Sequence, residues 1–172
     1  MKSELESIQE WYEYNSFVRK KYQRAIFSEV PETERYKDRG ASYPSIVDIF
    51  VHVLDGYRWW FLYVYNDRTS DATTMSGRKK YSQLEVIEEE QKIDALVMGI
   101  VKAITPEGLD LVLTVHEAPD QTWSIKLREI LLHMIEEELQ HRGEMNALLW
   151  QINVEPPITE LQDYLRQRQH VH

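Results

Sequence analysis

The sequence predicts an all-α protein that folds as a four-helix bundle, with a short β-hairpin before the last long helix and a short helix at the C-terminus. Apolar residues recur at helical spacing along four segments, each of roughly 20 residues or more. Polar stretches with proline, glycine or many charges separate these segments. The chain has 172 residues, 42% of them hydrophobic, which predicts a single domain over residues 1–172 with its own core.

The first helix is predicted from residue 4 to about residue 28. Asn15 lies on its apolar face and has two interpretations: a core amide bonded to a neighbour, or a polar group that points toward a site between helices. Residues 31–44 carry prolines, Gly40 and many charges, so they are expected to form a loop. The apolar face consists of Leu5, Ile8, Trp11 or Tyr12, Val18, Tyr22 and Ile26.

The second helix is predicted to begin after Ser45 and to run to about Asn66. Ser45 and Asp48 can form a capping box, in which each side chain bonds a backbone amide at the helix start. His52 lies on the inward face, where a single histidine is more often a core residue than a ligand. The same face carries Ile49, Val53, Tyr57, Trp60 and Val64.

After a polar connection at residues 67–80, the third helix is predicted from Ser82 to about Ile104. Ser82 and Glu85 form a second capping box, which marks the start of this helix. The three glutamates at residues 88–90 are interpreted as a solvated face. The apolar face is formed by Val86, Ile93, Val97, Ile100 and Ile104.

A β-hairpin is predicted next, because leucine and valine alternate with other residues over 109–115. Pro119-Asp120 is typical of its turn, and Ser124 is the predicted N-cap of the long helix that follows. Pro156-Pro157 ends the region of that helix, and a last short helix is predicted from Thr159 to about Gln167.

The long helix covers residues 127–150 and contains the most informative feature of the chain. Glu137 and His141 fall on its apolar face, although an unpaired buried charge costs several kcal/mol. A partner must therefore compensate for them. Gly143 costs about 1 kcal/mol relative to alanine inside a helix, which predicts a close approach of another helix or of the site there. The apolar face itself consists of Ile130, Met134, Met145, Leu148 and Ile152.

A metal ion is one partner that the pattern predicts. Glu137 and His141 are about 40° apart on the helical wheel, so both side chains can reach a common ion. His52 would complete a set of two imidazoles and one carboxylate with exchangeable positions, which suits Zn, Ni or Fe. The alternative is a buried salt bridge between Glu137 and His52 or His141, with no ion.

Glu138 is a second candidate ligand, because it forms Glu-x-x-His with His141. That spacing is typical of di-iron bundles, which need the motif on two helices, and no other predicted helix here carries it. Glu136 points about 140° away from the face and is expected to be solvated. His133, about 80° away, is either a partner of the ligands or a boundary residue.

The composition excludes several classes of function. Twenty Lys and Arg against 29 Asp and Glu give a net charge of −9, which argues against binding of nucleic acid or of anionic membranes. The absence of cysteine excludes disulfides and Cys-ligated metal sites. The polar N-terminus is unlike a signal peptide, so a cytoplasmic protein is expected.

The C-terminal part of the long helix resembles the terminal signature of the DinB/YfiT superfamily. The matching residues are His141-Arg142-Gly143-Glu144, Ala147-Leu148-Leu149 and Pro156-Pro157, and the resemblance extends to Tyr14-Asn15, to residues 45–52 and to residues 123–133. It implies a bundle connected up-down-down-up, with one metal ion between the second and fourth helices. Of the family's three histidine ligands, the first and last correspond to His52 and His141, whereas the middle one corresponds to Glu137.

The resemblance implies a metal-dependent hydrolase or a thiol-dependent transferase that acts on a small-molecule substrate, with Tyr14 and Asn15 lining its pocket. Glu137 in place of a histidine would lower the Lewis acidity of the metal. A non-catalytic binding or stress-response protein, with a structural or vestigial site, is a second hypothesis. A third is a homodimer whose exposed tryptophan and tyrosine side chains form the subunit interface.

Overall fold

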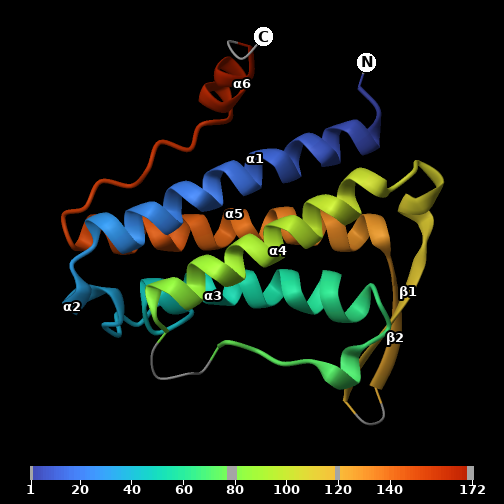
Figure 1. The fold of residues 1–172 in the computed structure, drawn as a ribbon, viewed down its shortest axis with the longest axis horizontal. Helices are drawn as coiled ribbons and strands as arrows, with labels where there is room; N and C mark the ends of the chain where they lie inside the picture. The colour runs from blue at the N-terminus through green and yellow to red at the C-terminus, as the bar shows by residue number, and fades with distance from the viewer. Residues whose placement is uncertain (1, 77–80, 119–120, 170–172) are drawn as a thin grey trace.

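Four long helices pack side by side in the computed structural model, which describes residues 2–76, 81–118 and 121–169 (Figure 1). The first and last run in one direction and the two between them in the opposite direction, so the connection is up-down-down-up as expected. The hairpin and a short C-terminal helix are also present. The four helices are α1 (Glu4–Arg24), α3 (Ile46–Tyr57), α4 (Gln83–Ala103) and α5 (Leu127–Gln151).

Both α1 and α3 continue into wider π-helical turns. Ala25–Glu29 extends α1 and Arg58–Val64 extends α3, which brings both ends close to those predicted. Shorter elements lie in the connections: α2 (Glu32–Arg35) and two 3-10 turns, Thr69–Asp71 and Glu107–Asp110.

The predicted caps of α3 and α4 are confirmed. In α3 the Ser45 hydroxyl accepts from the Asp48 amide and the Asp48 carboxylate accepts from the Ser45 amide. Ser82 and Glu85 make the same pair of bonds in α4. Each box satisfies two amides that have no partner within the helix. The five residues predicted to face inward from the second helix are all buried.

The hairpin consists of β1 (Val112–Ala118) and β2 (Gln121–Lys126), which pair antiparallel. The predicted turn at Pro119-Asp120 lies outside the described residues. Two details of the prediction are wrong. The strand begins later, because residues 107–110 form a 3-10 turn. Ser124 is not the N-cap, because it pairs with Thr114 within the hairpin, and Lys126 caps α5 instead.

The core is divided lengthwise into two hydrophobic clusters. One lies toward the hairpin and includes Tyr57, Ile130 and Met134. The other lies toward the far end of the bundle and includes Ile49, Met145 and Tyr22. None of the described helices combines the length and the hydropathy needed to cross a lipid bilayer.

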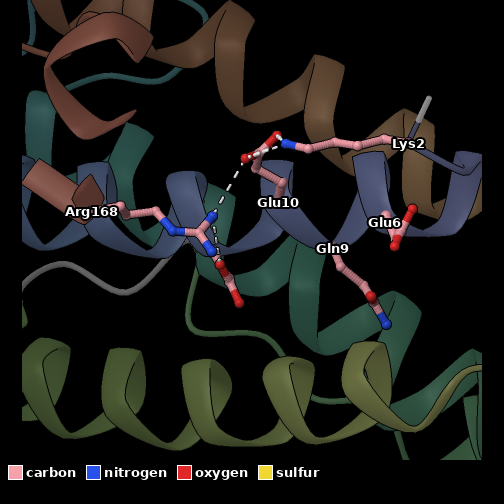
Figure 2. A pocket seen from close by; sticks show the side chains of 6 residues that line it. Lys2, Glu6, Gln9, Glu10 and Arg168 are labelled. Atoms are coloured by element: carbon pink, nitrogen blue, oxygen red, sulfur yellow. Dashed lines mark hydrogen bonds and ion pairs between the residues drawn. The ribbon is translucent and has the colours of Figure 1, made fainter. Parts of the chain in front are cut away.

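The C-terminal helix α6 (Leu161–Gln169) rests against α1. Figure 2 shows Arg168 beside the first turns of α1, where it pairs with Glu10 at 3.4 Å and Glu13 at 3.2 Å. Lys2 pairs with Glu10 from the other side at 2.7 Å. Exposed ion pairs of this kind contribute at most about 1 kcal/mol each, so the buried Tyr164 ring contributes more to docking.

The predicted close approach at Gly143 is wrong. Among the described residues, no atom lies within 4 Å of the position that a Cβ would occupy there. Close approach occurs instead at Gly56, where an added Cβ would lie 3.3 Å from Met134 Cε. The α3–α5 contact is therefore tight at Gly56, and Gly143 faces open space.

Replacement of Gly143 by alanine should therefore stabilise the protein by about 0.5–1 kcal/mol, because alanine loses less backbone entropy and nothing is displaced. Urea unfolding would measure the change. Gly99→Ala, also in open space on a helix, should behave alike, whereas Gly56→Ala must displace Met134 and should gain less or lose stability. A loss of stability in Gly143→Ala would contradict this and show that another part of the protein covers α5 at Gly143 in solution.

Candidate metal centre

Three side chains from α3 and α5 converge on one point. Glu137 Oε1 lies 3.0 Å from His52 Nε2 and 3.1 Å from His141 Nε2. One ligand atom from each residue lies within 4.8 Å of the others. The structure therefore brings together all three residues that the sequence singled out.

The positions of these residues follow from the helices that carry them. Glu137 and His141 are one turn apart on α5, so both face α3, where His52 stands two turns after the Ser45 cap. The His141 side chain is 3% exposed, whereas His52 is 24% and Glu137 21% exposed. The site is thus closed behind His141 and accessible beside His52 and Glu137.

A second carboxylate fixes the orientation of His141. Glu144 Oε2 lies 2.9 Å from His141 Nδ1 and also accepts a hydrogen bond from the Ser42 hydroxyl. Because an ionised carboxylate can only accept, this contact places a proton on Nδ1 and leaves Nε2 as the ring nitrogen that faces Glu137. Histidine ligands of metals are typically held in this way by a carboxylate on the other ring nitrogen.

Tyr43 borders the site from the loop that precedes α3. Its ring stacks on His52 with centroids 4.0 Å apart, and its hydroxyl lies 3.0 Å from His52 Nε2. Burial, together with the negative charges of Glu137 and Glu144, raises the pKa of the Tyr43 hydroxyl. The phenol is therefore a hydrogen-bond donor at neutral pH.

Both carboxylates of the site are ionised. Burial alone would raise the pKa of Glu137, but its contacts with the His52 and His141 imidazoles lower it overall. Burial also acts to raise the pKa of Glu144, and hydrogen bonds from Ser42 and His141 outweigh it, so that this pKa is lowered as well. A cation placed between the imidazoles would meet a negatively charged oxygen.

Two of the three separations in the triad suit a transition metal ion. Two ligand atoms about 2.1 Å from an ion, at angles of about 90–110°, are about 3.0–3.4 Å apart. The separations of 3.0 and 3.1 Å from Glu137 Oε1 to the two imidazole nitrogens agree with this spacing. Two imidazoles and one carboxylate are donors that Zn, Ni and Fe accept, so this triad could hold a metal.

A comparison with protein families identifies the family of this chain. The family model described as the DinB family matches residues 1–170. The chain belongs to the DinB family. None of the curated proteins is significantly similar to it in sequence. The fold is that of the family, and Glu137, which stands where the resemblance described above implies a histidine, lies at the centre of the triad.

Glu138, the rival carboxylate, points into the bundle and away from the triad. Its Oε2 accepts from Arg19 at 2.9 Å and from the Tyr57 hydroxyl at 2.6 Å, and its Oε1 faces Arg142 at 3.4 Å. The residue is 2% exposed. Both oxygens are thus occupied by internal partners, which favours Glu137 as the ligand.

The buried cluster around Arg19 also corrects the interpretation of the glutamate run. Glu90 is not solvated but 1% exposed, with Oε1 3.7 Å from Arg19 Nε. Asp94 pairs with the same guanidinium at 3.2 Å. Burial would lower the pKa of Arg19, but the charge of Glu138, followed by those of Glu90 and Asp94, raises it overall.

The remaining site predictions have separate outcomes. Asn15 is a core amide, since its oxygen accepts from buried Arg142. Tyr14 donates to the Thr159 carbonyl and packs against Tyr164, so it joins α1 to the C-terminal segment. His133 is a half-exposed boundary residue whose ring lies against Trp60.

Three residues of the site were not predicted as part of it. Glu144 could have been found, because it lies three residues after His141 on the same side of the helix. Ser42 and Tyr43 had no such signal, since they lie in an irregular loop whose path no periodicity describes.

Proposed function

We propose that the protein binds one divalent transition metal, Zn, Ni or Fe, through His52, Glu137 and His141. The observation that carries this proposal is the position of Glu137 Oε1 between the two Nε2 atoms, at 3.0 and 3.1 Å. A salt bridge alone would satisfy Glu137 with one imidazole. The triad has a second imidazole, and the Glu144 carboxylate orients the ring of His141. Both features favour a site that coordinates a metal ion.

Each residue has a distinct task in this proposal. Glu137 contributes a negative charge, His141 is held rigidly by Glu144, and His52 lies at the accessible side. When bound, the metal would supply Lewis acidity for hydrolysis of an ester or amide bond or for activation of a thiol. Because three ligands leave exchangeable positions, a small-molecule substrate can reach the site past His52 and Glu137.

Elemental analysis of protein purified without chelator or added metal tests this proposal. We expect about one equivalent of Zn, Ni or Fe in the wild type and a loss of most of it in His141→Ala. His52→Ala should give the same loss, and because His52 is more exposed, this variant removes a ligand with less effect on the core.

His133→Ala is the matched control, because it removes a histidine from the same helix without touching the triad. It should retain the metal. Circular dichroism and thermal unfolding would confirm that each variant is folded. A wild-type protein that takes up no Zn, Ni or Fe, even when each is added in excess, would refute the metal centre and leave the triad as a hydrogen-bonded salt bridge.

A further inference from the structure

Tyr43 makes three contacts with the candidate metal centre. Its ring lies flat on His52, with an interplanar angle of 21°, and edge-on to His141, with centroids 5.8 Å apart. Its hydroxyl lies 3.0 Å from His52 Nε2. The stacking fixes the ring, so the hydroxyl is held beside the nitrogen that would coordinate the ion.

His52 Nε2 therefore has two neighbours, the Tyr43 hydroxyl and Glu137 Oε1, both at 3.0 Å. Coordination would use the lone pair of this nitrogen. The Tyr43 hydroxyl would then lose its acceptor and need another, because a buried or half-buried donor without a partner is costly. A ligand atom at an exchangeable position of the ion is an acceptor that the metal centre itself would supply.

Distances allow this exchange of partners. With an imidazole–metal bond of about 2.1 Å, the hydroxyl lies at most about 5 Å from the ion. A ligand atom about 2.1 Å from the ion, with a hydrogen bond of about 2.8 Å beyond it, spans the same distance. The hydroxyl is thus within reach of an oxygen bound at an exchangeable position.

On the basis of the metal centre proposed above, we propose that Tyr43 is a specificity-determining residue whose hydroxyl donates a hydrogen bond to a substrate oxygen at the exchangeable position. Oxygen accepts such bonds well, whereas sulfur is a weak acceptor. This hydrogen bond therefore raises the affinity of the site for carboxylates and other oxygen ligands more than its affinity for thiols. This favours hydrolysis over thiol transfer as the reaction class.

The test compares wild type and Tyr43→Phe, both loaded with Co(II) as a spectroscopic substitute and titrated with acetate or with 2-mercaptoethanol. Phenylalanine keeps the stacking on His52 and removes only the hydroxyl. We expect Co(II) affinity to change less than threefold and acetate affinity to fall about tenfold or more, as loss of a hydrogen bond to a charged group predicts. Thiol affinity should change less than threefold.

Tyr65→Phe is the control, because it removes a phenol that packs against the hydrophobic cluster toward the hairpin and not against His52. It should leave all three affinities unchanged. Unaltered acetate binding in Tyr43→Phe, or an equal loss of acetate and thiol, would overturn the role of Tyr43 while the metal centre stands. Loss of Co(II) itself in Tyr43→Phe would also overturn it, since Tyr43 would then be a ligand. A wild type that binds no Co(II) would overturn both proposals.

Discussion

Glu137→Gln is expected to lower the affinity for a divalent metal by at least about a hundredfold, with little effect on the fold. The amide carries no charge and is a poorer ligand than a carboxylate. Loss of a residue that only orients a ligand already costs about 10–100-fold, so loss of the ligand itself should cost at least as much. Glu137 is 21% exposed, and its replacement leaves no uncompensated charge in the core. Isothermal titration with Zn would measure the affinity.

Two neighbouring glutamates provide matched controls for this result. Glu144→Gln keeps all three ligands but weakens the contact that orients His141, so we expect an intermediate loss of about 10–100-fold. Glu138→Gln, measured under conditions where it is folded, should change the affinity less than threefold. If Glu138→Gln abolished binding and Glu137→Gln did not, the carboxylate would have been assigned wrongly.

Glu138→Ala should have its effect on stability instead, with a loss of about 3–5 kcal/mol in the free energy of unfolding. Glu138 is the shared partner of two buried guanidiniums, those of Arg19 and Arg142, which are 3% and 5% exposed. Removal of the carboxylate leaves their charges incompletely compensated in the core. The buried Tyr57 hydroxyl also loses its acceptor.

Urea unfolding, and the midpoint of thermal unfolding, would measure this loss. For a chain of this size, each kcal/mol lost from the free energy of unfolding lowers the thermal midpoint by about 2–4 °C. The midpoint should therefore fall by roughly 6–20 °C. Glu136→Ala is the control, because Glu136 is on the same helix with its side chain 71% exposed, and its replacement should cost at most about 0.5 kcal/mol. A loss below about 1 kcal/mol in Glu138→Ala would mean that Arg19 is compensated by Glu90 and Asp94 alone.

Glu137 and Glu138 show which part of the ligand assignment helical periodicity can predict and which part it cannot. On a helical wheel both residues are close enough to His141 to share an ion, and the angle favours Glu137. That preference agrees with the structure, in which Glu137 faces His52 and Glu138 faces Arg19. A helical wheel of α5 cannot show why Glu138 is unsuited as a metal ligand. The Arg19 and Tyr57 side chains that bind it come from other helices, α1 and α3.

The interpretation of residues 88–90 as a solvated face was wrong at Glu90 for the same reason. A run of glutamates is usually solvated, and Glu88 is exposed. Glu90 is buried because Arg19, from α1, lies opposite it. The burial of a charged residue on α1 requires partners, but those partners lie on α4 and α5, far along the chain, where no local pattern can identify them.

By itself, the sequence determined the four helices, the two serine capping boxes, the hairpin before α5 and the alignment of Glu137 with His141. These features depend on interactions within a few residues, where spacing fixes geometry. The tertiary structure decided which carboxylate faces α3, which charges are buried together, and that Ser42 and Tyr43 border the site. Those contacts join segments distant in the chain, so packing of the helices, which no local pattern encodes, determines them.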